Sequence, residues 1–186
     1  HQIDDILTTN NCSHFFMEKG GRPDGIISSV CKNLVNAIAV CGKEHVHGDI
    51  FAFGSKWLSS LVNYEIPYVP YMVNLPDIDG YFRDELNIPK DHLVIGRNGG
   101  YDTFDLPFVY QPIVDFVEKH KDVYFVFANT RPFANHPQIK YVREINTKQG
   151  KSNFINACDF MIHARQRGES FGLAIAEFLY HNKPVL

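Results

Sequence analysis

Runs of apolar residues alternate with helix-like patterns from residue 93 to residue 186, and this alternation limits the possible fold more than any other feature of the sequence. The apolar runs contain few polar residues, which indicates strands buried on both faces, as in a parallel sheet covered by helices. Such alternation is typical of a doubly wound, Rossmann-like α/β domain. Strands are expected at 93–96, 123–128, 139–142, 160–164 and 184–186, and helices at 107–120, 151–158 and 171–181.

The pattern before this region is less regular. Apolar residues at helical spacing predict a helix at 29–41, and a short apolar run predicts a strand at 49–54. Ser55 is expected to cap the helix that follows it. Residues 67–73 contain two prolines and are expected to be extended. The polar stretch 74–80, which contains Pro and Gly, is expected to be a linker.

We therefore expect two parts in the chain. Residues 77–186 should form the Rossmann-like doubly wound parallel sheet, and residues 1–76 should form a partial second α/β portion. The chain begins without Met and stops within an expected strand at Leu186. These two ends suggest a fragment, or an unusually minimal member, of something larger.

Charge and composition exclude several classes of protein. The 186 residues include 18 Lys and Arg against 21 Asp and Glu, so no basic excess is present for a broad electrostatic grip on nucleic acid or anionic lipid. Hydrophobic residues make up 45%, which is enough for a folded core. The longest apolar run, 123–128, is far too short to span a bilayer, so no transmembrane segment is expected.

The cysteines indicate a reducing compartment. Cys12, Cys31, Cys41 and Cys158 are too few and too scattered for a disulfide framework. The first residues do not form a basic and then apolar leader. We therefore expect a cytoplasmic protein, with peripheral association with a membrane left open.

Two segments follow expected strands and contain residues suited to ligand binding. Ligands of such sheets bind beyond the carboxyl ends of the strands, next to helix N-termini. The first segment, 97–100, reads Arg97-Asn-Gly99-Gly100, and the glycines either form a tight turn or let a phosphate approach the backbone. The second segment, 165–170, leads into the last expected helix.

The start of that last helix has the features of an anion site. Ser170 is expected as its N-cap, and Gly172 would let a ligand approach the backbone closely. The unpaired N–H groups of residues 171–173 would favour a phosphate. Glu177 follows Ser170 by two helical turns, so it would lie on nearly the same face, about 10 Å along the axis. Carboxylates at both ends, Glu169 and Glu177, could then accept hydrogen bonds from vicinal diols.

These residues resemble a known family. The stretch 168–178 reads Gly-Glu-Ser-Phe-Gly-Leu-Ala-Ile-Ala-Glu-Phe and is followed by Asn-Lys-Pro-Val at 182–185. Together with the segments 86–97 and 154–162, it resembles the donor-binding domain of retaining glycosyltransferases with two Rossmann-like domains, the GT-B fold of family four. The resemblance is good from residue 86 to residue 186. Residues 12–75 resemble, more loosely, the tail of the acceptor-side domain.

The resemblance implies a role for each motif residue. Glu169 would hold hydroxyls of the transferred sugar, and Glu177 would bind the ribose diol of the nucleotide. Arg97 would meet the diphosphate. The backbone N–H groups for the sugar and the diphosphate would come from Ser170, Phe171, Gly172 and Leu173. The family usually has a phosphate-binding lysine shortly after the arginine, but residues 98–105 contain none, and Arg165 or Arg167 would have to compensate.

The implied function is the transfer of a sugar from a nucleoside diphosphate donor to the hydroxyl of a glycan or another acceptor, with the anomeric configuration kept. The resemblance implies no metal and no cofactor, and a longer parent chain or a partner would supply the acceptor domain. A nucleotide-sugar-binding module without turnover is the alternative. Among rival motifs, Gly150-Lys-Ser152 lacks the earlier Walker glycine, since that position is Ile145. Cys41, His45 and His47 have no clear fourth metal ligand nearby.

Overall fold

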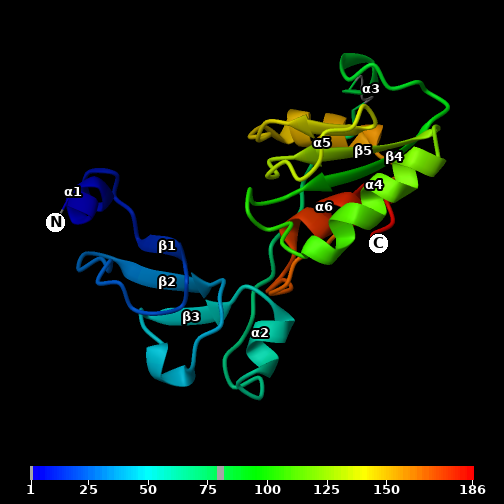
Figure 1. The fold of residues 1–186 in the computed structure, drawn as a ribbon. Helices are drawn as coiled ribbons and strands as arrows, with labels where there is room; N and C mark the ends of the chain where they lie inside the picture. Colours follow the sequence, from blue (N-terminus) through cyan, green and yellow to red (C-terminus); the bar gives the residue numbers. More distant parts are fainter. Residues whose placement is uncertain (1, 79–81) are drawn as a thin grey trace. The chain divides into compact units, whose positions relative to one another are not determined.

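The computed structural model of the chain describes residues 2–78 and 82–186 (Figure 1). The chain forms two compact units, His1–Met72 and Val73–Leu186. The division falls just before the stretch 74–80 that was expected to be a linker, of which residues 79 and 80 lie outside the described part. Within the described part, no helix is long and apolar enough to cross a membrane.

The first unit contains a three-stranded parallel sheet in the order β1-β2-β3. Its core includes Met17, Val35 and Phe53 from the strands and Leu58 from the helix after them. Ser55 caps that helix as expected, because its hydroxyl accepts a 3.1 Å hydrogen bond from the backbone N–H of Leu58. The elements of this unit are α1 (Gln2–Thr9), β1 (His14–Lys19), β2 (Lys32–Ala37), η1 (Lys43–His45), β3 (Ile50–Phe53) and α2 (Lys56–Ser60).

The prediction of a helix at 29–41 is wrong, since this segment contains the central strand β2. Val35 and Ala37 lie two positions apart and are both in the core, which is the period of a strand. β2 pairs in parallel with β1 and β3, so neighbours on both sides satisfy its backbone. Asn33 fixes its start, because the side chain donates to the carbonyl of Ser28 and the backbone N–H donates to Asp49. Tertiary pairing therefore overrides the helical spacing.

The second unit contains a four-stranded parallel sheet in the order β6-β5-β4-β7. Counted within this unit, the order is 3-2-1-4, which is the order of a Rossmann-like sheet. The expected strands at 123–128 and 139–142 are confirmed at both ends. The expected strand at 160–164 is shorter, and 184–186 contributes a single parallel bridge from Val185 to Met161. The strands are β4 (Leu93–Asn98), β5 (Val123–Ala128), β6 (Ile139–Val142) and β7 (Phe160–Met161).

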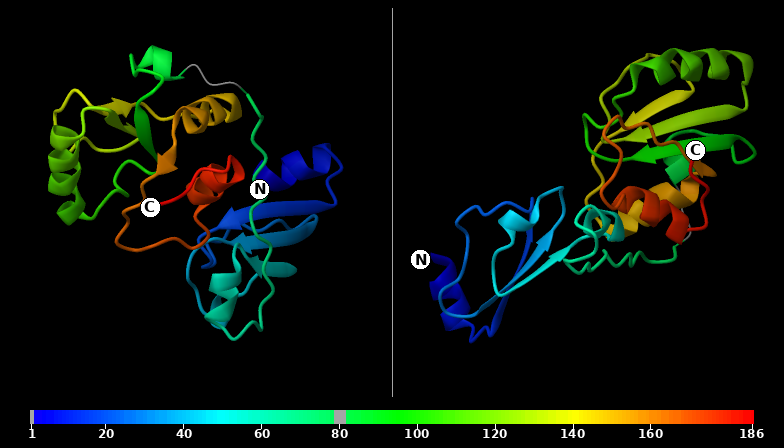
Figure 2. Two further views of the ribbon diagram at one scale, coloured as in Figure 1. Left: turned by 90° about the vertical axis from the view of Figure 1, so that its right-hand side faces the viewer. Right: turned by 90° about the horizontal axis from the view of Figure 1, so that it is seen from below.

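Helices cover both faces of this sheet, which confirms the expected α/β class (Figure 2). Val94 and Val126 face one side and pack with Phe154 of α5 and Phe178 of α6. The alternate strand positions face α4 on the other side. The helices are α3 (Phe82–Glu85), η2 (Pro107–Val109), α4 (Tyr110–Lys119), α5 (Lys148–Ala157) and α6 (Leu173–Tyr180).

One close contact determines how α5 ends against the sheet. Gly96 of β4 faces the side chain of Cys158 so closely that a Cβ at this position would overlap the sulfur atom. Cys158 is fully buried, and burial raises the pKa of its thiol to about 12. The thiol therefore acts as a small apolar side chain.

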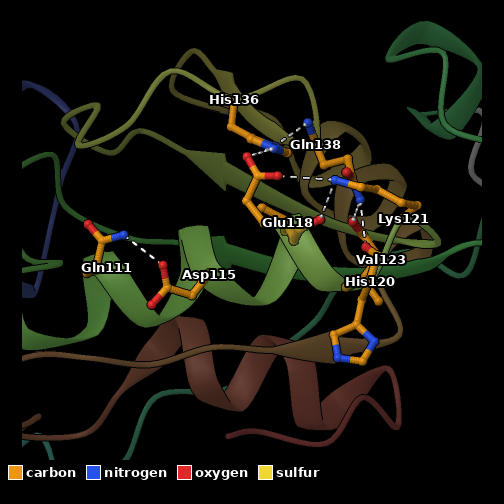
Figure 3. Close-up of polar contacts among 9 residues, drawn as sticks. Gln111, Asp115, Glu118, His120, Lys121, Val123, His136 and Gln138 are labelled. Atoms are coloured by element: carbon orange, nitrogen blue, oxygen red, sulfur yellow. Dashed lines mark hydrogen bonds and ion pairs between the residues drawn. The ribbon is translucent and has the colours of Figure 1, made fainter.

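A polar network fixes the amino-terminal edge of the same sheet (Figure 3). Glu118, near the end of α4, lies 3.3 Å from both the Lys121 ammonium and the His136 ring. The Gln138 amide donates hydrogen bonds to the carbonyls of His120, at 2.8 Å, and Val123, at 2.6 Å. These contacts join the turn before β5 to the segment before β6, so the carboxyl ends of the strands lie at the opposite edge.

Candidate functional site

A pocket lies at the carboxyl-terminal edge of the second sheet. The strand order reverses between β4 and β7, and in open α/β sheets this is where ligands bind. The pocket has a volume of about 340 Å³ and combines segments that follow β4, β5 and β6 with residues of α5 and α6. Its lining residues are Asn98, Gly99, Asn129, Glu144, Ile145, Asn146, Lys151, Leu173, Ala174 and Glu177.

Glu177 lines this pocket although its side chain is almost completely buried. The residue is 5% exposed, and its carboxylate Oε1 lies 2.7 Å from the ammonium of Lys151. A buried carboxylate needs such a partner, since an uncompensated charge in a protein interior is strongly unfavourable. Lys151 comes from the second turn of α5, which begins at Lys148 because the Thr147 hydroxyl caps it.

The start of α6 differs from the expectation. Ser170 is not the N-cap, because the helix begins at Leu173 and Gly172 is the N-cap residue. Gly172 is left-handed, with φ 79° and ψ 58°, a conformation that glycine adopts without steric cost. Ser170 and Glu177 therefore do not share a helix face. No side chain caps α6, and its first residues Leu173 and Ala174 line the pocket, so the positive end of the helix dipole lies there.

Glu169 belongs to a second group of side chains before α6. Its Oε2 accepts a 2.7 Å hydrogen bond from the guanidinium of Arg165, and its Oε1 lies 3.6 Å from Nε2 of His163. Burial lowers the pKa of His163, and the negative charge of Glu169 opposes part of this effect. Arg165, which was expected to compensate for a missing phosphate ligand, is therefore already paired with a carboxylate.

The sequence suggested that Arg97 lies in the loop after the strand 93–96, but the structure places it within β4. It is only 2% exposed, because β4 continues to Asn98. Its guanidinium donates hydrogen bonds to the hydroxyls of Thr130, at 2.5 Å, and Thr103, at 2.6 Å. Burial lowers the pKa of Arg97 to about 10, so the group is still charged at neutral pH. The ring of Phe104 lies 5.3 Å from the guanidinium carbon.

The two glycines after β4 are held from several sides. The Gly99 carbonyl accepts a 2.8 Å hydrogen bond from the Asn129 side chain, and the Gly100 carbonyl accepts one from the Thr103 hydroxyl. A side chain at Gly99 would press against the guanidinium of Arg97. This loop is therefore shaped by close packing, and Gly99 is the member of the pair that lines the pocket.

The comparisons with known proteins agree with the fold. No family model matches the sequence, and no curated protein matches it. Among solved structures, HepE of Anabaena in complex with UDP and glucose has a TM-score of 0.58 at 15% identity, over 83% of this chain and 52% of that one. TarM has a TM-score of 0.61 at 11% identity, over 97% of this chain and 42% of that one. MnaA of S. aureus with UDP has a TM-score of 0.51 at 12% identity, over 99% of this chain and 59% of that one.

The chain has a Rossmann-like GT-B fold. It spans about half the length of the HepE and TarM chains. At these identities the likeness establishes the architecture, and the chemistry depends on the residues of this chain.

The GT-B pocket brings together some of the expected residues and adds others. Gly99, Leu173 and Glu177 line it, whereas Glu169 and Arg165 form the separate pair before α6. Ser170 and Phe171 are partly exposed between these two groups. Among residues 2–78 and 82–186, no three His, Cys, Asp or Glu side chains are grouped as metal ligands.

Several pocket residues were missed. Asn98 lies in the expected ligand segment 97–100 but was assigned no role of its own. Asn129 comes directly after the end of β5, and that position is a signal that the sequence contains. The segment Glu144–Asn146 follows β6 in the same way. Lys151 has no comparable signal, because its contact with Glu177, 26 residues later in the chain, depends on the packing of two helices.

Proposed function

We propose that the second unit binds a nucleoside diphosphate sugar in the pocket at the carboxyl edge of its sheet, and that the chain belongs to a retaining glycosyltransferase of family four. The observation that carries this proposal is one pocket lined by the carboxylate of Glu177, the uncapped start of α6 and the backbone of Gly99. These three groups match the diol, the diphosphate and the close backbone approach that such a ligand requires.

Each group then has a defined role. Glu177 accepts hydrogen bonds from the ribose hydroxyls. The N–H groups at the start of α6 and the backbone of Gly99 and Gly100 bind the diphosphate. Glu169 binds hydroxyls of the transferred sugar, and its ion pair with Arg165 orients the carboxylate. The buried guanidinium of Arg97 supports the Gly99–Gly100 loop from below and adds positive charge behind the diphosphate.

The resemblance to family four implies the course of the reaction. The acceptor hydroxyl attacks the anomeric carbon, and the bond to the nucleotide phosphate breaks with its electron pair on the phosphate oxygen. The hydroxyl attacks from the face that the phosphate leaves and gives its proton to that phosphate, so the configuration is kept. Positive charge at the start of α6 stabilises the departing diphosphate. No metal ion or cofactor is required in this proposal.

The acceptor half of the reaction is only partly represented in the first unit, which we propose to be the end of an acceptor-side domain. A longer chain or a partner would complete it. A second candidate function is a nucleotide-sugar-binding module without turnover. Two observations favour it: residues 98–105 contain no lysine, and both Arg97 and Arg165 are already engaged by protein groups.

Two measurements on the purified chain test the proposal. In a thermal-shift panel of UDP, GDP, ADP and their glucose conjugates, at least one nucleotide should raise the melting temperature by binding the folded state. No shift with any of them would contradict the proposed function. Release of nucleotide from the best donor, with and without sugar acceptors, then separates an enzyme from a binding module.

A further inference from the structure

The ion pair between Lys151 and Glu177 gives the pocket a property that the sequence motif does not contain. We propose that Lys151 is a positioning residue that compensates the charge of the Glu177 carboxylate and orients it for the ribose diol of the ligand. This inference rests on the proposed function. It assigns to a residue of α5 the ability of the pocket to distinguish a ribonucleotide from one without the diol.

The burial of Glu177 makes a partner necessary. A carboxylate that is 5% exposed loses most of its hydration, and a compensating group beside it offsets that cost. The Lys151 ammonium supplies that group at 2.7 Å, and its side chain is itself only 27% exposed. Among the described residues that line the pocket, Lys151 is the one with a cationic side chain. Without it, no pocket-lining group would balance the carboxylate.

The other charged groups near Glu177 do not replace Lys151. Glu144 lines the same pocket and is an anion. His181 follows α6, and burial lowers the pKa of its ring, so it is mainly neutral at pH 7. Its Nε2 lies 3.4 Å from the hydroxyl of Ser152. The charges of Lys183 and Asp77 affect the pKa of His181, and neither residue lines the pocket.

The helix packing fixes the geometry of the pair. Phe154 of α5 and Phe178 of α6 are both fully buried and meet edge to face, with ring centroids 6.2 Å apart. Each aromatic residue lies within one turn of its charged neighbour, Lys151 or Glu177, so the two backbones are held at a constant separation. The lysine side chain therefore reaches the carboxylate from a rigid base, and one carboxylate oxygen is held in place.

The test compares UDP with its 2′,3′-dideoxy analogue by calorimetry. We expect the unmodified chain to prefer UDP by roughly tenfold or more, since hydrogen bonds to a charged group are worth about 1.5–3 kcal/mol. Lys151→Met should reduce this preference to less than about threefold, and Lys151→Arg should keep most of it. Lys148→Met, an exposed lysine on the same helix, is the matched control and should behave like the unmodified chain.

Each result has a separate meaning. If the unmodified chain binds no nucleotide, the proposed function fails. If it prefers UDP and Lys151→Met keeps that preference, the inference about Lys151 alone is overturned. Should Lys151→Met not fold, the double variant K151M/E177Q removes both charges and should match Glu177→Gln in its preference. If the double variant binds UDP a further tenfold more weakly than Glu177→Gln does, the inference is overturned, because Lys151 would then bind the ligand directly.

Discussion

The guanidinium of Arg97 donates a 2.5 Å hydrogen bond to the hydroxyl of Thr130 and so joins the ends of two neighbouring parallel strands. The same guanidinium donates to the Thr103 hydroxyl and, at 3.4 Å, to the Gly100 carbonyl. Arg97 therefore lies beneath the glycine loop that borders the pocket. Its burial makes it a structural member of the site, in addition to any effect of its charge on a ligand.

Replacing Arg97 by Met should lower the free energy of unfolding by about 1–3 kcal/mol, because the hydroxyls and the carbonyl that it binds lose a charged donor. The same substitution should raise the dissociation constant for UDP more than that for uridine, since positive charge acts where phosphate is present. Urea unfolding and calorimetry measure the two effects.

The control for this substitution is Arg131→Met. Arg131 forms an ion pair with Asp102, but both side chains are about two-thirds exposed, and such pairs contribute roughly 0–1 kcal/mol. Equal losses of stability for the two variants would show that burial of Arg97 is not what makes its contacts important.

A Gly96→Ala substitution should destabilise the second unit by about 1–3 kcal/mol, because the new methyl group would overlap the sulfur of Cys158 and force α5 away from the sheet. Thermal unfolding followed by circular dichroism is the measurement. Cys158→Ala in the same chain should recover part of the loss, because it removes the atom that the methyl group meets.

Gly20→Ala provides the comparison, since a Cβ at Gly20 would meet no atom within 4 Å. The free energy of unfolding of this variant should lie within about 0.5 kcal/mol of that of the unmodified chain. If Gly96→Ala is equally harmless, the tight contact between β4 and the end of α5 is not a determinant of the fold.

The stability of the protein should fall as the pH is lowered from about 7.5 to 5.5, and His163 should contribute to this fall. Burial lowers the pKa of His163 below its usual value in an unfolded chain, about 6.5. Between the two values the unfolded chain binds more protons, so acid favours unfolding, and the stabilising effect is fully present above pH 6.5. Unfolding free energies across this pH range should show a smaller fall for His163→Asn.

His14→Asn is the matched control, because His14 is exposed. Its curve should run parallel to that of the unmodified chain. His181 has a pKa lowered by burial as well, so His163→Asn should remove only part of the dependence. Parallel curves for all three proteins would contradict the role given to His163.

The sequence predicts the second sheet well because its strands are buried on both faces. β5 and β6 are confirmed at both ends, since a run such as Val123–Ala128 is apolar throughout and fits no exposed structure. The prediction for segment 29–41 is wrong because its pattern is ambiguous. Its apolar residues satisfy a helical and a strand period at once, and only the pairing of β2 with two neighbours decides between them.

The site could be predicted only where local sequence determines position. Gly99 could be placed because it directly follows a strand, and Glu177 because its motif lies in the helix that begins at the same edge of the sheet. The N-cap was misplaced because Ser170 has the better capping side chain, whereas the left-handed turn at Gly172 decides where α6 begins. Lys151 could not be foreseen, because its role arises from the packing of α5 against α6.

The central claim is that Glu177 forms part of a nucleotide site, and calorimetric titration with UDP tests it most directly. The unmodified chain should bind UDP. Glu177→Gln should weaken binding by about 1.5–3 kcal/mol, or roughly 10- to 150-fold, while the protein still folds. Glu85→Gln, at an exposed glutamate of α3, should leave the affinity unchanged. Equal affinity of Glu177→Gln and the unmodified chain for UDP would remove Glu177 from the site and contradict the account.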